Sequence, residues 1–207
     1  MENEAVKDAI VYVIDDDEGA RQSLEFLIDV AGIRVRSFSS ADAFLQSAPP
    51  LARACIVTDV RMPGMSGIDL ATRMSERDGG APVIVITGHA DVPLAIQAMK
   101  AGAADFIEKP FDDETILSAI RTALARSGEE EEVQSRRREV LSRIETLSGR
   151  EREVVDGLVE GKANKVIAID LDISPRTVEV YRANAMMKMQ ARTLSDLVRM
   201  MTIATIV

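Results

Sequence analysis

Polar residues that can bind a cation or a phosphoryl group stand at the ends of four short β-branched runs within residues 1–126. They are Asp15 and Asp16, Asp59, Thr87, and Lys109. In an open parallel sheet the carboxyl ends of the strands meet at one edge, so we expect these side chains to lie close together. Carboxylates this close need a cation among them, and hard oxygen ligands favour Mg²⁺ or Mn²⁺. Lysine and threonine suit phosphoryl oxygens, so the set predicts transfer of a phosphoryl group onto a carboxylate.

The elements that must hold these residues are strands alternating with helices over residues 1–126. The predicted strands are the β-branched runs at 10–14, 33–38, 54–58, 82–87 and 105–108. Five such units predict an α/β doubly wound fold, in which a five-stranded parallel sheet carries helices on both faces. No GxGxxG sequence follows the first strand, which argues against a dinucleotide site.

Each polar residue also has an ordinary structural interpretation. An aspartate after a strand is most often a helix N-cap, and this is the role we expect for Asp17. The sequence DVRMPGMSG at 59–67, taken alone, indicates a turn. His89, the only histidine, is expected to be an exposed loop residue rather than a phosphorylated one. The functional interpretation therefore depends on several polar groups reaching the same edge.

Composition narrows the class of protein. The 207 residues are 46% hydrophobic and 29% charged, and they include one cysteine and one histidine. This composition excludes a disulfide scaffold and a cysteine zinc site, and it disfavours a serine–histidine–aspartate triad. The first residues are acidic, and no apolar run reaches the roughly 20 residues of a membrane helix. We therefore expect no signal peptide, no membrane contact and a cytoplasmic location.

Charge divides the chain into three parts. Residues 1–126 carry 12 basic and 20 acidic side chains, residues 127–143 carry 4 and 5, and residues 144–207 carry 9 and 9. The middle part is predicted as a charged helical linker because its glutamates precede arginines by four residues. It is either a solvated linker or a continuation of the preceding helix that takes part in dimerisation. The Ser127–Gly128 pair is its expected weak point.

The last part, residues 144–207, has the pattern of a small all-helical domain. Ser148 and Glu151 form a predicted capping box, and Ser174 with Pro175 is a predicted helix start. The segment NKVIAIDLDIS at 164–174 indicates a short helix followed by a tight turn. These signals predict a helix–turn–helix. The domain has no net charge, so an interaction with nucleic acid must depend on local features.

The first part of the chain resembles the receiver domain of two-component response regulators. The motifs that carry the resemblance are IDDDE at 14–18, DVRMPGMSG at 59–67, ITGHA at 86–90 and EKPF at 108–111. The resemblance implies the strand order 2-1-3-4-5 and a cis bond between Lys109 and Pro110. It also implies self-catalysed phosphorylation and dephosphorylation only, so the protein is not expected to be an enzyme in the usual sense.

The same resemblance implies a role for each residue at the predicted edge. Asp59 is the phosphoacceptor, while Asp16 binds Mg²⁺ directly and Asp15 binds it through water. The backbone carbonyl of Arg61 is a further metal ligand. Thr87 and Lys109 bind the phosphoryl oxygens, and Phe106 is the aromatic switch.

The helix predicted at 91–101 is apolar on nearly all sides. Such a helix is fully buried, covers an interface, or is an alanine-rich surface helix. Similarity to the FixJ family of response regulators favours the interface. It implies that Ile96 and Lys100 lie on the face through which phosphorylated receivers form a homodimer.

The segment 147–189 resembles the LuxR-type helix–turn–helix through the pattern GxxNKxIAxxLxIS followed by TVE. Many LuxR-type domains have histidine where Tyr181 stands, and tyrosine is typical of the FixJ family. The helix at 174–189 is the expected recognition helix, and its core-facing residues are predicted to be Val178, Tyr181, Ala185 and Met189. Recognition helices read base edges while nearby cations hold phosphates.

We expect two groups of DNA contacts. The predicted base readers are Glu179, Val180, Ala183 and Asn184. The predicted phosphate contacts are Lys165, Arg176, Thr177, Arg182 and Lys188. An ordinary alternative for Glu179 is a solvent-facing helix charge.

Together these resemblances imply a FixJ-like transcriptional response regulator. A sensor histidine kinase would phosphorylate Asp59, the receiver would dimerise, and the C-terminal domains would bind double-stranded promoter DNA. Activation is the expected effect, with RNA polymerase as a further partner. Two alternatives stay open. One is a phosphatase with an aspartyl-phosphate intermediate, although DDDEG at 15–19 lacks the threonine or valine of DxDx(T/V). The other is an interaction module that senses phosphorylation without DNA.

Overall fold

The computed structural model describes residues 9–89 and 92–205. The chain forms two compact units, which divide between Glu131 and Glu132. This division differs from the three segments 1–126, 127–143 and 144–207 that the sequence suggests. The difference arises because one long helix, α5 (Asp113–Glu145), contributes residues to both units.

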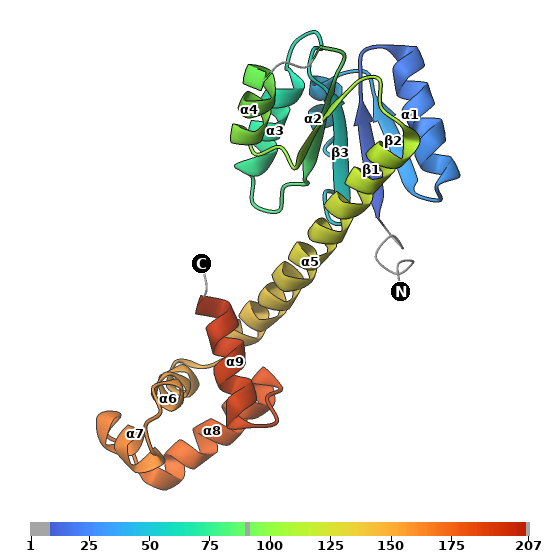
Figure 1. The fold of residues 1–207 in the computed structure, drawn as a ribbon. Coiled ribbons are helices and arrows are strands. Elements are labelled where there is room, and N and C mark those ends of the chain that lie inside the picture. The colour runs from blue at the N-terminus through green and yellow to red at the C-terminus, as the bar shows by residue number, and fades with distance from the viewer. Residues whose placement is uncertain (1–8, 90–91, 206–207) are drawn as a thin grey trace. The chain divides into compact units, whose positions relative to one another are not determined.

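The first unit contains the predicted parallel sheet (Figure 1). Its strands are β1 (Ile10–Ile14), β2 (Arg34–Phe38), β3 (Ala54–Asp59), β4 (Val83–Thr87) and β5 (Asp105–Glu108). All four strand pairs are parallel, and the order is β2-β1-β3-β4-β5. The fold class and the strand order are therefore confirmed.

Helices cover both faces of this sheet. They are α1 (Glu18–Val30), α2 (Ala41–Ser47), α3 (Gly67–Ser75), α4 (Val92–Lys100) and the first part of α5. Because side chains alternate along a strand, Tyr12 and Ile14 pack in one core with α2 and α3, while Val11 and Val13 pack in the other with α1 and α5. β1, β3 and β4 are therefore buried on both sides and hold the ends of the strands in place.

Local capping fixes where the helices beside the strand ends begin. Asp17 accepts a hydrogen bond from the backbone N–H of Ala20 at 2.7 Å and caps α1, as predicted. Ser66 and Asp69 form a capping box that opens α3. The Lys109–Pro110 bond is cis, which confirms that expectation.

Helix α5 runs without interruption through Ser127 and Gly128, where we expected a weak point. The charged segment is therefore helical, as predicted, and continuous with the preceding helix. Near its end, Val140 and Ile144 are 3% and 5% exposed and pack in the core of the second unit. The hydrophobic core of that unit therefore begins before residue 144.

Four further helices complete the second unit. They are α6 (Gly149–Val159), α7 (Asn164–Asp170), α8 (Pro175–Met189) and α9 (Leu194–Thr205). The capping box of Ser148 with Glu151 and the N-cap at Ser174 are both present. The predicted core face of α8 is confirmed, since Val178, Ala185 and Met189 are fully buried and Tyr181 packs beside them.

Candidate functional site

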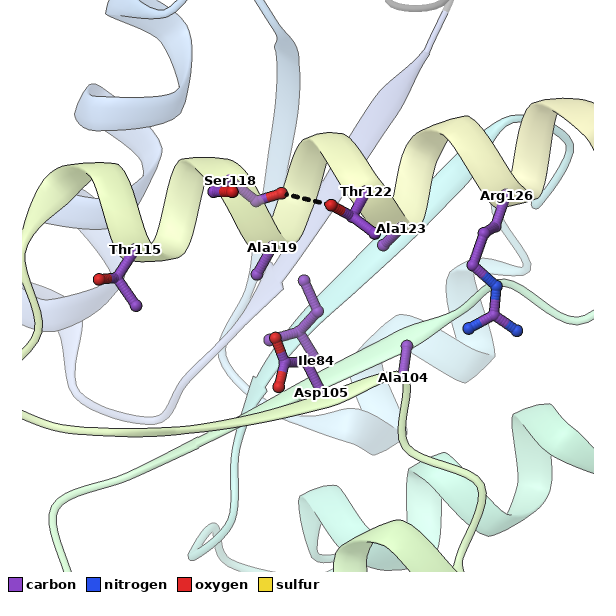
Figure 2. A pocket seen from close by; sticks show the side chains of 9 residues that line it. All are labelled: Ile84, Ala104, Asp105, Thr115, Ser118, Ala119, Thr122, Ala123 and Arg126. Atoms are coloured by element: carbon purple, nitrogen blue, oxygen red, sulfur yellow. Dashed lines mark hydrogen bonds between the residues drawn. The ribbon is translucent and has the colours of Figure 1, made fainter.

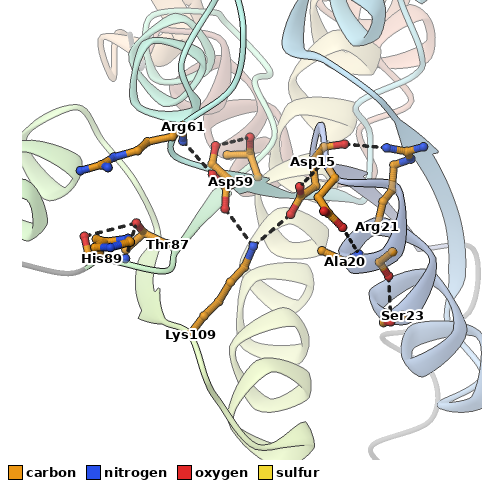
Figure 3. A network of polar contacts seen from close by, with 12 residues as sticks. Asp15, Ala20, Arg21, Ser23, Asp59, Arg61, Thr87, His89 and Lys109 are labelled. Carbon is orange, nitrogen blue, oxygen red and sulfur yellow. Dashed lines mark hydrogen bonds and ion pairs between the residues drawn. The ribbon is translucent and has the colours of Figure 1, made fainter.

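The ammonium group of Lys109 joins two carboxylates at the carboxyl edge of the sheet (Figure 3). Its Nζ lies 2.8 Å from Oδ1 of Asp59 and 3.0 Å from Oδ2 of Asp15. Lys109 and Asp15 directly follow β5 and β1, and Asp59 is the last residue of β3, so the parallel topology brings together groups up to 94 positions apart in the chain. The predicted convergence of the strand ends is present.

Backbone groups fix the two carboxylates in place. Oδ2 of Asp59 accepts the backbone N–H of Arg61 at 2.7 Å, and Oδ1 of Asp15 accepts the backbone N–H of Asp17 at 2.9 Å. The side chain of Arg21 donates to the carbonyl of Asp15 at 2.8 Å. Asp15 is 2% exposed and Asp59 is 14% exposed, so Asp59 is the carboxylate that solvent can reach.

The charge on Lys109 is strongly favoured at this position. Burial alone would lower the pKa of its ammonium, but the hydrogen bonds and negative charges of Asp59 and Asp15 outweigh burial and raise the pKa above its ordinary value. Lys109 therefore stays protonated at neutral pH. It offsets the repulsion between two carboxylates that would otherwise face each other unpaired.

Thr87 and Phe106 connect this edge to the neighbouring loop and strand. Thr87 is 1% exposed, its hydroxyl donates to the carbonyl of His89 at 3.3 Å, and it accepts the backbone N–H of His89 at 3.2 Å. His89 is exposed, as we expected of a loop residue. Phe106 is half-buried on β5 and packs against the core formed with α2 and α3. Thr87 thus ends β4, where its carbonyl accepts the backbone N–H of Lys109 at 2.8 Å, while Phe106 lies within β5.

Carboxylate oxygens, which are hard ligands, lie at this edge of the sheet. Within residues 9–89 and 92–205, no three histidine, cysteine, aspartate or glutamate side chains lie close enough to hold a metal ion. Asp16 is exposed beside the buried Asp15. In this structure the ammonium of Lys109 lies between the carboxylates of Asp15 and Asp59.

Helix α4 presents large apolar side chains to solvent. Val92, Ile96 and Met99 are 73%, 50% and 53% exposed, while Ala98 is fully buried against the sheet. Lys100, at the end of the helix, is also exposed. Asp91, the first residue of the predicted helix, lies outside the described residues. The predicted dimer residues Ile96 and Lys100 are therefore both accessible.

The second unit exposes the predicted base readers on one side of α8. The exposed residues are Glu179, Val180, Ala183 and Asn184. Two of the predicted phosphate contacts, Lys165 and Arg176, are exposed. The hydroxyl of Thr177 shares a hydrogen bond of 2.7 Å with the hydroxyl of Ser174. Nη1 of Arg182 donates to Oδ1 of Asn164 at 3.4 Å.

Lys188 has a different environment from the other predicted phosphate contacts. Its Nζ lies 2.6 Å from Oε2 of Glu151, whose side chain is 6% exposed. The hydrogen bond from Lys188, together with the backbone N–H of Ser148, holds the pKa of Glu151 below its ordinary value. The charge of Lys188 is therefore already paired inside the second unit.

A hollow of about 300 Å³ lies beside β5 and α5, away from the residues described above (Figure 2). Its lining consists of Ile84, Ala104, Asp105, Thr115, Ser118, Ala119, Thr122, Ala123 and Arg126. None of these is a predicted site residue. The chemistry predicted from the sequence therefore belongs to the carboxyl edge of the sheet rather than to this hollow.

Comparison with known proteins identifies both units. Residues 11–121 match the family described as response regulator receiver domain, and residues 145–201 match the bacterial regulatory proteins of the luxR family. The chain is 57% identical over 194 residues to the transcriptional regulatory protein FixJ of Azorhizobium caulinodans, covering 94% of this chain and 92% of that protein. It is 49% identical over 193 residues to FixJ of Rhizobium meliloti, covering 93% and 95%.

The chain is a response regulator of the FixJ family. Among solved structures, this FixJ-family regulator is similar to the response regulator StyR, with a TM-score of 0.84, 38% identity, and coverage of 94% and 98% of the two chains. It also matches full-length FixJ from B. japonicum, with a TM-score of 0.56, 48% identity, and coverage of 95% and 97%.

Membership of the family settles the general function. This FixJ-family regulator combines a receiver domain with a LuxR-type DNA-binding domain and controls transcription, so its partners include a kinase and DNA. It belongs to a family of transcription regulators rather than of enzymes. Receiver domains generally bind Mg²⁺ at the phosphorylation site. In the part of the chain that the structure describes, no helix is both long enough and apolar enough to cross a membrane.

Proposed function

We propose that Asp59 is the residue that accepts the phosphoryl group from a sensor histidine kinase. The observation that supports this most directly is the contact of Lys109 with Asp59 at 2.8 Å, because it places a fixed positive charge beside the more exposed of two neighbouring carboxylates. An ammonium group in that position can neutralise the oxygens of an incoming phosphoryl group.

The transfer needs no proton from Asp59. A carboxylate oxygen of Asp59 attacks phosphorus, a new P–O bond forms, and the bond from phosphorus to its donor breaks with the electron pair leaving on the donor. The ammonium of Lys109 then donates a hydrogen bond to a phosphoryl oxygen in place of Asp59, while Asp15 keeps that ammonium in position. The backbone N–H of Arg61 holds the second oxygen of Asp59 and orients the carboxylate. Hydrolysis of the acyl phosphate by water reverses the modification, so phosphorylation and dephosphorylation are both catalysed within the receiver.

The donor set at this edge suits a magnesium ion. The carboxylates of Asp15, Asp16 and Asp59 and the carbonyl of Arg61 are hard oxygen ligands, and few protein ligands leave room for water and a phosphoryl oxygen. When bound, Mg²⁺ or Mn²⁺ would neutralise charge on the transferring group. One ammonium beside two carboxylates also leaves the cluster negatively charged, which favours a divalent cation.

Phosphorylation is proposed to reach a dimer interface on α4 through Thr87 and Phe106. The hydroxyl of Thr87 contacts only the backbone of His89 among the described residues, and it can turn to a phosphoryl oxygen at Asp59. Such a turn would break the contacts of Thr87 with the backbone of His89, and the ring of Phe106 would change its position with them. The exposed apolar side chains of α4 around Ile96, with Lys100 beside them, supply an interface for a second receiver.

The C-terminal domain is proposed to bind paired promoter half-sites in double-stranded DNA with α8 in the major groove. The exposed residues Glu179, Val180, Ala183 and Asn184 would read bases. Lys165, Arg176, Thr177 and Arg182 would contact phosphates. Dimerisation raises the effective concentration of the second domain, so phosphorylation strengthens binding to paired sites most. The names of the FixJ relatives support transcriptional control, and we propose activation through contact with RNA polymerase.

Phosphorylation of purified protein tests the assignment of Asp59. With acetyl phosphate and Mg²⁺, intact-mass spectrometry should detect one added phosphoryl group that is labile as an acyl phosphate. Asp59→Asn or chelation of the metal should prevent it. Asp17→Asn is the matched control, because asparagine also caps a helix and this residue lies near the site. Equal labelling of Asp59→Asn and the wild type would refute the assignment.

A further inference from the structure

The C-terminal end of α8 is held by a side chain from α5. The last residue of α8 is Met189, and Nη1 of Arg143 donates a hydrogen bond to its carbonyl at 3.2 Å. The chain turns after Met189 through Gln190, which has a φ of 54°. In that turn the N–H groups of Gln190 and Ala191 satisfy the carbonyls of Met187 and Met186. The carbonyl of Met189 is bonded instead by α5.

The guanidinium of Arg143 is itself oriented. Its Nη2 lies 2.6 Å from Oε1 of Glu139, one turn earlier on α5, and the Arg143 side chain is only 20% exposed. On the same face of α5, Val140 and Ile144 are buried in the core that also contains Val178, Ala185 and Met189. Buried apolar residues therefore adjoin Arg143 along α5, and its own low exposure limits the freedom of its side chain.

A second ionic contact restrains the same end of α8. Lys188 bonds the buried carboxylate of Glu151, which also accepts the backbone N–H of Ser148 at 2.8 Å. The two contacts attach neighbouring residues of α8 to the end of α5 and to the start of α6. Two cations at a helix C-terminus also interact favourably with the helix dipole.

We propose that Arg143 is a positioning residue for DNA recognition, which sets the orientation of α8 by binding the carbonyl of Met189. This proposal rests on the proposed function of α8 as the base-reading helix. The predicted base readers from Glu179 to Asn184 lie on the same rigid helix, so a change of tilt at its C-terminal end displaces all of them together. Loss of the contact should therefore reduce discrimination between sequences more than general attraction to DNA.

The experiment compares variants of the phosphorylated full-length chain. The probes are a paired duplex, selected from a random library by the wild-type protein, and a scrambled duplex of equal length. Arg143→Gln should weaken binding to the selected duplex about 10-fold, because holding α8 in its base-reading orientation then costs about the free energy of the lost charged hydrogen bond. It should leave the affinity for scrambled DNA and the slope of log K against log salt unchanged. Arg143→Lys should bind the selected duplex with intermediate affinity, because an ammonium group cannot contact both Met189 and Glu139 as the guanidinium does.

Two further variants keep the result interpretable. Arg136→Gln removes the same charge from an exposed position of α5 and should bind like the wild type. Glu139→Gln keeps the arginine but removes its orienting carboxylate, and a several-fold loss on the selected duplex alone would support the proposal even if Arg143→Gln unfolds. The proposal is wrong if Arg143→Gln matches Arg136→Gln, or if it weakens both duplexes equally with a shallower salt slope. If the wild-type protein selects no duplex, the proposed function itself fails.

Discussion

Replacing Gly67 with alanine is expected to destabilise the first unit and to slow phosphorylation. Gly67 begins α3, and its N–H donates to the carbonyl of Val60 at 3.1 Å, so the helix start lies directly against the end of β3. A methyl group at this position would lie 2.9 Å from Cγ2 of Thr58 and 3.0 Å from the carbonyl carbon of Asp59, with the carbonyl oxygen of Asp59 closer still. Backbone cannot rotate away as a flexible side chain can, so α3 or the phosphoacceptor must move.

The cost of this overlap can be estimated. Inserting a methyl group into a packed site costs about 1–3 kcal/mol, and a clash with backbone belongs at the upper end of that range. With a urea dependence of about 2 kcal/mol per M, the midpoint for unfolding of the first unit should fall by roughly 1–1.5 M. A displacement of about 1 Å at a reacting group can cost on the order of 100-fold in rate. Labelling of Asp59 by acetyl phosphate should therefore slow at least about 10-fold.

Gly128→Ala is the matched control, and we expect it to raise rather than lower the stability of the first unit. Gly128 lies inside α5, and a methyl group there would meet nothing within 4 Å. Alanine in a helix is favoured over glycine by about 0.5–1 kcal/mol, so the urea midpoint should rise slightly and labelling should be unchanged. Urea titration followed by circular dichroism and timed mass spectrometry measure both quantities. If Gly67→Ala has the same urea midpoint and the same labelling rate as the wild type, then the close packing of α3 on Asp59 does not govern the site.

Three further predictions concern the dimer face, the DNA contacts and acid stability. Ile96→Glu should prevent dimerisation of the phosphorylated protein in light scattering without changing its labelling, and normal dimers would place the interface elsewhere. Arg176→Ala should weaken binding to all duplexes and reduce the salt slope by about 0.9, whereas Glu179→Ala should change sequence preference only; fluorescence anisotropy distinguishes them. Because the hydrogen bonds of Lys188 and Ser148 hold the pKa of Glu151 below its ordinary value of 4.5, the stability from this pair is present above that value and is lost as the pH falls through the lowered pKa. Glu151→Gln should therefore reduce the loss of stability of the second unit on acidification, as measured by thermal unfolding.

Local signals in the sequence predicted the elements of this protein well. The β-branched run at 10–14 coincides with β1, and the run at 105–108 coincides with β5. The capping residue Ser148 starts α6 as expected. These predictions succeeded because strand propensity and N-terminal capping act over a few neighbouring residues. The meeting of Asp15, Asp59 and Lys109 could also be predicted, since parallel strands bring their carboxyl ends to the same edge.

Other features depended on contacts between residues far apart in the chain. The sequence shows that a cation is needed among the carboxylates, but only the structure places the ammonium of Lys109 between Asp15 and Asp59. Lys188 has the charge of a phosphate contact, and only the structure shows that its Nζ lies 2.6 Å from Oε2 of Glu151 on another helix. A periodic pattern within one helix carries no information about a partner 37 positions away.

The sequence alone therefore determined which elements form, the parallel order implied by its motifs, and the residue types available for chemistry. Tertiary structure decided which charges are paired and how far each core extends. Helix α5 illustrates the reason: its charged middle gives no apolar period, so neither its continuity through Gly128 nor the burial of Val140 and Ile144 followed from local preference. Burial depends on the surface that other helices present, and a charge is paired only when folding brings its partner within a few ångströms.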